Sequence, residues 1–482
     1  MPTTLRPEPG MIIDGFRLEE QLHQGGMALL WRVTRVEDNQ DDRNESGAAL
    51  PLMMKIPFLG DNDDPTAIVG FEVEQMIMPR LSGPHVPLFV AAGDFTSNPY
   101  IVMEQIAGNS LRARFDAAPL AANEVVAIGA KIATALHDLH RQQVIHLDLK
   151  PSNVMFRENG EAVLIDFGLS RHDKLPDLLA EEFRLPIGTA PYISPEQVLH
   201  IRNDPRSDLF ALGALLYHLC TGQRAHGNPS SVRGLRRRLY RDPIPPRAHN
   251  PQIMPWLQEI ILRCLEVDPA RRYDSAAQLA FNLNHPEQVA LTERALKTRS
   301  DRWHWLLKRW FDASSFQPVP HQSAGRQLSK SPIVVVAINL AKGSLALDEA
   351  LRTTARRILL TEPGARLACV TVQKTNRIGM DVLTDQEGQN LHVKHLVELK
   401  HWARPLQLAG DRTTFHVLEA PDPAAAIVDY ARSNDVDHIV IGSRGTSMLR
   451  RYLGSVSSQV VAQADCSVTV VKSPRAAQER RN

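Results

Sequence analysis

The segment from Val144 to Val154 has the sequence VIHLDLKPSNV, and it decides how the rest of the chain is interpreted. It places Asp148, Lys150 and Asn153 on a short stretch between two apolar runs. Another apolar run precedes the tripeptide DFG at residues 166–168, which begins 13 residues after Asn153 (from 153 to 166). The pattern predicts a strand–loop–strand unit that brings two carboxylates and one amide close together.

Two carboxylates and an amide on such a unit suit the transfer of a phosphoryl group. One carboxylate, that of Asp148, would accept the proton of the attacking hydroxyl. The other, that of Asp166, would hold Mg2+ against the phosphates together with Asn153. A DFG tripeptide alone is more often a turn after a strand, so the prediction rests on the whole set at this spacing.

The composition is that of an ordinary globular protein. The chain has 482 residues, of which 43% are hydrophobic and 23% charged, so two or three domains with large cores are expected. Its formal net charge of +1 is too small to attract nucleic acid or an anionic membrane to the protein as a whole. Four cysteines are far apart and form no C-x-x-C pair, which favours a reducing compartment.

We expect neither a signal peptide nor a transmembrane segment. The first ten residues contain three prolines and no apolar core. No apolar run approaches the roughly 18 residues that a membrane span requires. These features predict a cytoplasmic protein.

Residues 11–285 are predicted to form one large domain, with strands first and helices after them. Apolar residues at three- and four-residue steps predict a helix over residues 125–139, and residues 209–219 are apolar on all sides, as in a buried helix. This order indicates a two-lobed α+β domain. The strands are expected at residues 16–22, 29–36, 52–57, 89–95 and 100–104.

Residues 286–331 form a basic linker that holds three of the six tryptophans, at positions 303, 305 and 310. Three interpretations stay open. The segment packs on the first domain, which we favour, it binds a partner, or it lies on a membrane surface as a short basic helix.

Residues 332–474 alternate between apolar runs and helical patterns, which predicts a small five-stranded parallel α/β sheet with right-handed crossovers. The strands are expected at 333–338, 366–372, 414–418, 438–441 and 468–471. The helices are expected at 345–360, 391–408, 424–431 and 447–463.

Several motifs in order make residues 11–285 similar to the eukaryotic-like (Hanks-type) Ser/Thr protein kinases of bacteria. The resemblance implies the two-lobed kinase fold, ATP and Mg2+ as cofactors, and protein substrates with Ser or Thr acceptors. It gives Lys55 the contact with the α- and β-phosphates and makes Glu74, 19 residues later, its partner. It also implies that backbone groups of Glu104 and Ile106 bind adenine.

The same resemblance assigns the remaining parts of the site. Lys150 would lie near the transferred phosphate, and Asn153 and Asp166 would bind Mg2+. The segment GTAPYISPE at residues 188–196 resembles the substrate-docking segment, and its Thr189, together with Lys150, points to Ser/Thr acceptors. Arg272 would pair with Glu196. The stretch between these motifs, residues 169–187, corresponds to the activation loop.

The chain departs from the family at the glycine-rich loop. His23 and Ala28 replace two of the three usual glycines, while Gly25 and Gly26 still allow the backbone to approach a phosphate. We expect weaker or slower nucleotide handling.

A second departure concerns activation. Leu147 stands before the catalytic Asp, where many family members have an Arg that binds a phosphorylated loop residue. Ser170 is the only hydroxyl residue between Phe167 and Gly188. We therefore expect a kinase that is not switched on by a phosphate in its activation loop.

Residues 332–474 resemble the universal stress protein family, which implies a flavodoxin-like α/β fold with a five-stranded parallel sheet. ATP-binding members use a glycine motif, for which Gly442, Gly445, Gly454 and Ser455 are the candidates here. The spacing is one residue short, and Asn339 replaces the usual Asp, so nucleotide binding and a helix-capping turn are both open. Members often dimerise through the final strand, here residues 468–471, which makes a homodimer a further expectation.

The predicted function is that of a non-specific Ser/Thr protein kinase with a regulatory or dimerisation domain in stress signalling. The alternative is a pseudokinase, a nucleotide-binding scaffold with little phosphotransfer, for which His23, Ala28 and Leu147 are the arguments. A kinase for small molecules on the same fold is a third possibility.

Overall fold

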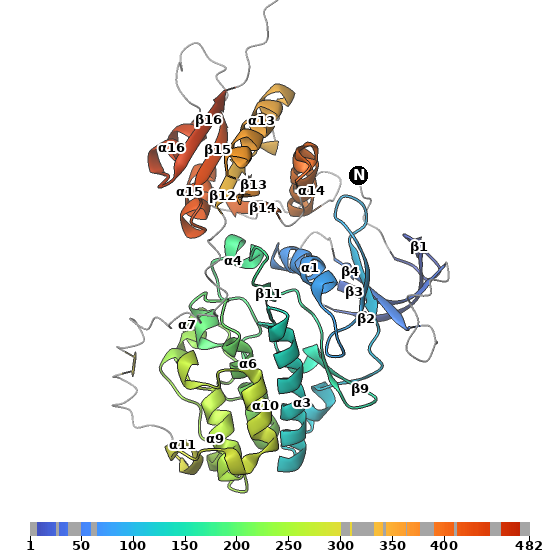
Figure 1. Cartoon of the computed structure of the whole chain (residues 1–482), viewed down its shortest axis with the longest axis vertical. Coiled ribbons are helices and arrows are strands. Elements are labelled where there is room, and N and C mark those ends of the chain that lie inside the picture. Colours follow the sequence, from blue (N-terminus) through green and yellow to red (C-terminus); the bar gives the residue numbers. More distant parts are fainter. Residues whose placement is uncertain are drawn as a thin grey trace, which may run out of the picture.

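The structure is a computed structural model of the whole chain (Figure 1). The residues that it describes are 7–25, 28–36, 50–58, 65–299, 309–310, 332–340, 344–362, 364–375, 390–408, 412–443 and 455–472. Within these ranges, no helix has the length and apolar character that crossing a bilayer demands.

The first lobe is a curled antiparallel sheet with one long helix. The six strands are in the order β1-β2-β3-β4-β6-β5. Their bounds are β1 Ile12–Ile13, β2 Phe16–Gln24, β3 Ala28–Arg35, β4 Leu52–Pro57, β5 Phe89–Gly93 and β6 Tyr100–Glu104, and helix α1 is Pro65–Ile77. The five predicted strands are present, and β1 is an additional two-residue strand that is too short to leave a periodic signal.

The second lobe is helical. Its long helices are α3 Ala122–Arg141, α6 Arg206–Thr221, α9 Pro255–Cys264 and α10 Ala276–Asn284. The apolar stripe predicted over 125–139 is the face of α3 that is buried. Nearly every side chain of α6 is buried, as predicted, and the helix ends at Gly222, whose φ of 69° suits a glycine in the left-handed region.

Short elements fill the rest of this domain. The strands are β7 Gly108–Ser110, β8 Val144–Ile145, β9 Val154–Arg157, β10 Ala162–Leu164 and β11 Arg171–His172. The helices are α2 Arg112–Asp116, α4 Leu178–Glu182, α5 Pro195–Val198, α7 Val232–Arg236, α8 Pro246–His249 and α11 Glu293–Leu296. Strands β9 and β10 pair with each other between the VIHLDLKPSNV and DFG motifs, which brings the two motifs together as predicted.

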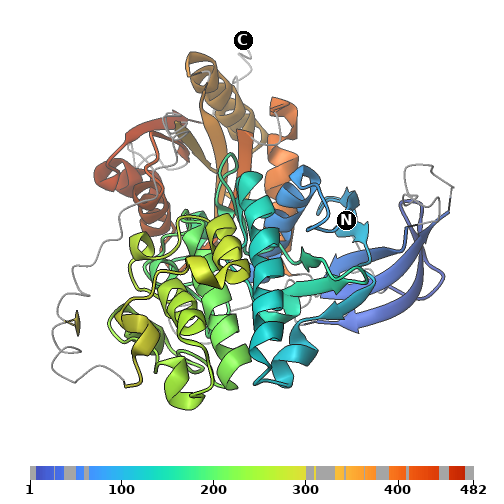
Figure 2. The same ribbon diagram turned by 60° about the horizontal axis from the view of Figure 1, so that its bottom comes forward.

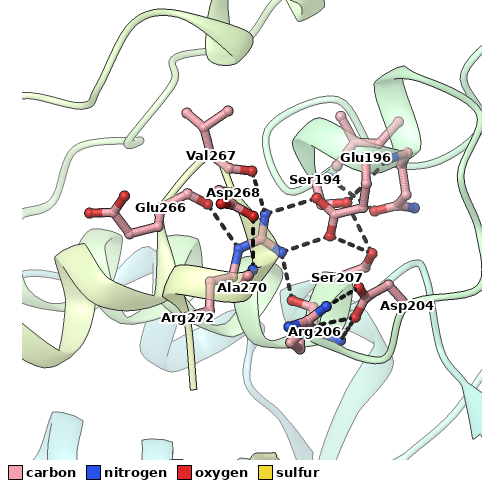
Figure 3. Close-up of polar contacts among 12 residues, drawn as sticks. Ser194, Glu196, Asp204, Arg206, Ser207, Glu266, Val267, Asp268, Ala270 and Arg272 are labelled. Atoms are coloured by element: carbon pink, nitrogen blue, oxygen red, sulfur yellow. Dashed lines mark hydrogen bonds and ion pairs between the residues drawn. The ribbon is translucent and has the colours of Figure 1, made fainter. Parts of the chain in front are cut away.

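A buried ion pair ties α5 to the end of α9 and the turn after it. The two guanidinium nitrogens Nη1 and Nη2 of Arg272 donate to the two carboxylate oxygens of Glu196 at 2.7 and 2.8 Å, and neither side chain is exposed (Figure 3). Ser207 donates a further hydrogen bond to Glu196 at 2.7 Å. The pair predicted from the sequence is therefore present, and it is fully satisfied.

The C-terminal domain is a five-stranded parallel sheet in the order β14-β13-β12-β15-β16. The strands are β12 Ile333–Ala337, β13 Arg366–Lys374, β14 Thr413–Ala420, β15 His438–Ser443 and β16 Ser467–Lys472. The helices are α13 Leu345–Thr361, α14 Leu391–Ala403, α15 Pro423–Ser433 and α16 Ser455–Gln463. The predicted parallel sheet is confirmed, and its order along the chain, 3-2-1-4-5, differs from the 2-1-3-4-5 order of flavodoxin.

One predicted helix is shorter than expected. The helix expected over 391–408 ends at Ala403 and continues as a 3-10 turn at Arg404–Leu406. Pro405 has no backbone N–H to continue the α-helical hydrogen bonds, which explains the end. The first part of the helix expected over 447–463 lies outside the described residues.

The start of the predicted linker packs on the large lobe. The side-chain amide of Gln258 on α9 donates to the backbone carbonyls of Arg294, Ala295 and Lys297. Thr292 bonds to the carboxylate of Glu259. The packing that we favoured is thus present at residues 292–297, whereas two of the three tryptophans, at 303 and 305, lie outside the described residues.

The C-terminal domain, coloured orange to red, lies against the side of the first domain that carries α1 and α4 (Figures 1 and 2). Helix α4 contacts α1, and it also contacts β14 and α15 of the C-terminal domain. The edge strand β14 therefore faces the first domain, and the opposite edge of the sheet is β16.

Candidate active site

Lys55, Glu74 and Asp166 form a charged cluster between the two lobes. The Lys55 ammonium lies 2.5 Å from a carboxylate oxygen of Glu74 and 3.1 Å from one of Asp166. The positive charge of Lys55 lowers the pKa of Asp166 to about 2, so this carboxylate is ionised at neutral pH. The Lys55–Glu74 pair that the family resemblance implies is present, and the DFG carboxylate joins it.

Two glycines let α1 approach the DFG motif. A Cβ atom on Gly70 would lie 3.1 Å from the carbonyl oxygen of Gly168, and one on Gly168 would lie 3.2 Å from that of Gly70. The close contact brings Glu74, which follows one turn later on α1, to the backbone N–H of Phe167 at 3.4 Å. A side chain at either glycine would push the helix away from the motif.

Asp148 is buried and accepts hydrogen bonds at both carboxylate oxygens. Its Oδ1 accepts from the backbone N–H and the hydroxyl of Thr189 at 3.0 and 2.6 Å. Its Oδ2 accepts from Lys150 at 2.6 Å. The amide of Asn153 donates to the Asp148 backbone carbonyl at 3.1 Å. The four residues predicted around the reacting groups are thus brought together.

Asp208 holds the backbone just before Asp148 in place, a role that the sequence analysis did not identify. Its two carboxylate oxygens accept the backbone N–H groups of His146 and Leu147 at 2.9 and 2.8 Å, and His140 Nε2 lies 2.8 Å away. Leu147 has a φ of 61°, so these bonds stabilise a backbone conformation that a leucine rarely adopts. The sequence pattern around Asp208 does not show these partners.

His146 is fully buried and connects the two motifs. Its Nε2 lies 3.1 Å from the carbonyl oxygen of Ile165, and its Nδ1 faces the backbone N–H of Asp148 at 3.4 Å. A carbonyl can only accept, so Nε2 carries the proton and Nδ1 accepts. The histidine therefore fixes the position of Asp148 relative to the DFG motif.

A cavity of about 550 Å³ lies above these groups. Predicted site residues that line it are Lys55, Glu74, Asp148, Lys150, Asp166 and Thr189. Residues 182–187 of the activation loop form part of its wall. Six of the predicted groups thus share one cavity, which opens between α1, the DFG motif and the activation loop.

The groups predicted to bind adenine lie outside this cavity. Glu104 and Ile106 are buried at the end of β6 and just after it. The carboxylate of Glu104 is held by Arg157, whose Nη2 donates to it at 2.9 Å. This pair, which the sequence did not suggest, ties the segment between the lobes to β9.

The described part of the glycine-rich turn begins with Gly25, whose backbone N–H donates to the carbonyl of Ala28 at 3.0 Å. Strands β2 and β3 pair up to Gln24 and Leu29 on either side. Gly26 lies outside the described residues.

The residues present fit a magnesium ion bound together with phosphates. Mg2+ is typically held by one or two carboxylates plus substrate phosphate oxygens. The ionised Asp166 side chain is 41% exposed and lines the cavity, and the side-chain amide of Asn153 lies 3.4 Å from Asp148 Oδ2. Among the described residues no group of three or more His, Cys, Asp or Glu side chains is arranged to hold a metal ion.

The hydroxyl group in the activation loop is not accessible to a phosphorylating enzyme. Ser170 is 2% exposed, and its hydroxyl donates to the backbone carbonyl of His146 at 3.0 Å. Leu147 is 4% exposed and packs in the interior. The acceptor hydroxyl and the arginine that would bind its phosphate are both missing from this arrangement.

The candidate site in the C-terminal domain is described only in part. Gly442 lies at the end of β15, and Asn339 follows β12, the neighbouring strand. The strand order reverses between these two strands, and that is where doubly wound sheets bind their ligands. Gly445 and Gly454 lie outside the described residues, as does the side chain of Ser455.

Comparisons with known proteins agree with both halves of this architecture. Residues 61–285 match the protein kinase domain family, and residues 332–472 match the universal stress protein family. "Serine/threonine-protein kinase PknB" of Mycolicibacterium smegmatis is 32% identical over 280 residues, which are 57% of this chain and 43% of that protein. "Probable serine/threonine-protein kinase PknB" of Lactococcus lactis is 29% identical over 268 residues, 55% of this chain and 41% of that protein.

"Serine/threonine-protein kinase PknB" of Mycobacterium tuberculosis is 28% identical over 280 residues, again 57% of this chain and 43% of that protein. The chain thus spans less than half the length of the curated relatives it matches. The chain contains a protein kinase domain and, C-terminal to it, a domain of the universal stress protein family.

Proposed function

We propose that this chain is a Ser/Thr protein kinase that transfers the γ-phosphate of Mg-ATP to a Ser or Thr hydroxyl of a protein. The observation that carries the proposal is the arrangement at Asp148. Its carboxylate accepts hydrogen bonds from Thr189 and Lys150 in the cavity that Lys55 and Asp166 also line. A carboxylate held in this way is placed to orient an incoming hydroxyl and accept its proton.

Each neighbouring residue has a role in this proposal. Lys55, oriented by Glu74, binds the α- and β-phosphates, and Lys150 lies where the charge of the transferred group develops. Asn153 and Asp166 hold Mg2+, which neutralises charge on the phosphates. Backbone groups of Gly25, Gly26, Glu104 and Ile106 bind the nucleotide.

The pseudokinase alternative is less well supported. A scaffold that only binds nucleotide need not keep Lys55 paired with Glu74 or Asp148 bonded to Lys150 and Thr189. A kinase for small molecules is also less well supported, because Thr189 begins a segment that resembles the protein-docking segment of the family.

We assign three regions to this function: a kinase domain at 11–285, a linker at 286–331 and a universal stress protein domain at 332–474. The last would regulate the kinase or form a homodimer through β16, and Gly442, Gly445, Gly454 and Ser455 would be its nucleotide contacts. We place the protein in the cytoplasm, where ATP is available.

The test is transfer of labelled γ-phosphate from Mg-ATP by the purified full chain. Acceptors are the chain itself, a generic protein, and small alcohols such as glycerol and ethanolamine. We expect label on Ser and Thr of the proteins. Label on the alcohols alone would identify a small-molecule kinase, and ATP binding without any transfer would identify the scaffold.

Activity is expected without a phosphate in the activation loop. The buried Ser170 hydroxyl already donates a hydrogen bond to the backbone carbonyl of His146, and Leu147 has no positive charge that could bind a phosphate. Mass spectrometry of the active protein, treated or not with a phosphatase, should find residues 169–187 unmodified and the activity unchanged. A phosphate on Ser170 or Thr189 that activity requires would contradict this prediction.

A further inference from the structure

Helix α4 lies in the activation loop and contacts both domains. Its N-terminal end is held by the kinase domain, because Asp177 caps the helix by accepting from the Ala180 N–H and also pairs with Arg202 at 3.0 Å. Arg202 in turn donates to the carbonyl of Leu169, next to the DFG motif. The C-terminal end of α4 carries two consecutive carboxylates, Glu181 and Glu182, and both pair with side chains of the other domain.

Glu181 is bound by three side chains of the universal stress protein domain. Arg366 at the start of β13 donates to both of its carboxylate oxygens, at 2.5 and 3.3 Å. Tyr430 on α15 donates to it at 3.1 Å, and His416 Nε2 lies 3.1 Å away. The Glu181 side chain is only 8% exposed, so this is a desolvated, specific contact rather than a surface ion pair.

Glu182 is bound by the same histidine. His416 Nδ1 lies 2.9 Å from the Glu182 carboxylate, and the histidine side chain has no exposed surface. Burial by itself lowers the pKa of His416, but its hydrogen bonds to Glu181 and Glu182 outweigh that effect and raise the pKa to about 9. The two carboxylates thus face two cations, His416 and Arg366, in a buried cluster.

A second contact reaches helix α1. Lys400 on α14 lies 2.8 Å from a carboxylate oxygen of Glu72, two residues before the Glu74 that orients Lys55. The ammonium also lies over the rings of Phe95 and Phe415, at 5.1 and 5.8 Å. The universal stress protein domain therefore touches both parts of the kinase domain whose positions decide whether the catalytic groups meet.

We infer that Arg366 and His416 are positioning residues for phosphoryl transfer, through which the universal stress protein domain holds the activation loop by Glu181 and Glu182. This inference rests on the proposed kinase function. The charges are the reverse of a phosphate switch: the loop supplies fixed carboxylates, and the other domain supplies the cations. These contacts explain how the activation loop is ordered, although its one hydroxyl is buried and no arginine precedes Asp148.

The arrangement held by these contacts is a productive one. Lys55 is paired with Glu74, and Thr189, which follows the loop, is bonded to Asp148 while α4 is docked. The contacts therefore support catalysis. An inhibitory role would predict the opposite effect of breaking them, and the test separates the two.

The test uses full chains with Arg366→Gln, His416→Gln or both. The matched control is Arg432→Gln, which removes an exposed ion pair with Asp465 in the same domain and touches neither Glu181 nor Glu182 by any of the contacts described above. We expect the double variant to lose at least about tenfold in kcat for a protein acceptor, with little change in the KM for ATP. Wild-type activity in the double variant, or higher activity, would overturn the inference.

The conservative variant Arg366→Lys separates charge from packing. This variant keeps the positive charge but loses the bidentate hydrogen bond to Glu181, so its activity should lie between those of the wild type and Arg366→Gln. Activity as low as that of Arg366→Gln would show that the charge is not what acts, and would overturn the ionic mechanism.

A second readout does not depend on catalysis. Amide hydrogen exchange of residues 178–183 in the full chain should be at least about tenfold faster in the double variant than in the wild type or Arg432→Gln. If the wild type transfers no phosphate, the proposed function fails, yet this exchange still tests the contact. Unchanged exchange would overturn the inference even in an active kinase.

The contact should also depend on pH. The pKa of His416 is higher in the docked state than its ordinary value of 6.5, so its contribution is complete below that value and is lost as the pH rises through about 9. Protection of residues 178–183, corrected for intrinsic exchange, should fall about tenfold for each pH unit between about 6.5 and 9 in the wild type, level off above about 9, and show no such fall in His416→Gln.

The other groups that face this histidine do not account for such a step. Burial raises the pKa of Glu181, but its contacts with His416 and Arg366 outweigh that effect and lower the pKa to about 2, while the pKa of Tyr430 is raised well above its usual value of 10.0. Burial raises the pKa of Glu182, and the hydrogen bond from His416 opposes that shift. The Lys400–Glu72 pair is present in both proteins. Equal pH profiles for the wild type and His416→Gln would contradict the role of His416.

Discussion

Replacement of Asp148 by asparagine is expected to lower phosphoryl transfer at least about 100-fold, because the general base contributes 10²–10⁴ in rate. The carboxylate accepts from Thr189 at one oxygen and from Lys150 at the other. An amide has one oxygen only, so it cannot accept at both positions, and it cannot take up the proton of the attacking hydroxyl. The measurement is initial-rate transfer of labelled γ-phosphate to a protein acceptor.

The control for this variant is Asp138→Asn on α3. The Asp138 carboxylate lies 3.4 Å from His85 Nε2, its side chain is 37% exposed, and it does not line the cavity that holds the reacting groups. The same chemical change there should leave the rate within about twofold of the wild type. Asp148→Asn protein that folds normally and transfers phosphate at the wild-type rate would remove Asp148 from the mechanism.

Replacement of Arg272 by methionine is expected to destabilise the kinase domain by about 3–5 kcal/mol, because it leaves the Glu196 charge buried without its partner. Both side chains of this pair are inaccessible to solvent. Arg272 also donates to the carbonyls of Arg206 and Glu266, which would be left without these bonds (Figure 3). For a domain of this size the loss corresponds to a decrease in Tm of about 6–20 °C, measured by calorimetry on the full chain.

Two further variants test the cause of that loss. Arg112→Gln removes an exposed ion pair to Asp116 and should change the stability of the domain by less than about 1 kcal/mol. Arg272→Met combined with Glu196→Leu removes both charges and should be less destabilised than Arg272→Met alone. A double variant that is less stable than the single variant would show that packing, rather than the unpaired charge, dominates.

Local patterns in the sequence were sufficient to locate the strands of the first lobe and the long buried helix. Alternation and helical periodicity depend on which face of an element is buried, and that is written into neighbouring residues. The predicted strand over 52–57 and the predicted strand over 100–104 have the same bounds in the structure. The helix predicted over 391–408 was too long because a single proline outweighs an otherwise helical pattern.

The candidate site was predicted in part for a related reason. Lys55, Asp148 and Asp166 belong to short motifs whose spacing is fixed by the strands and turns around them, so their types and order are visible in the chain. Their partners were less visible. Nothing in the local pattern around Asp208 shows that it accepts the N–H groups of His146 and Leu147, which lie about 60 residues earlier.

The sequence by itself determined the two domain types, the order of the catalytic motifs, and the lack of an arginine before Asp148 and of any hydroxyl residue but Ser170 between Phe167 and Gly188, since each of these is visible in short runs of residues. Only the tertiary structure decided what holds the activation loop in place of a phosphate. Glu181 and Arg366 are 185 residues apart, and Glu182 and His416 are 234 apart. A glutamate pair on a short helix is ordinarily solvated, and only the meeting of two domain surfaces removes the water and turns these charges into a specific, buried contact.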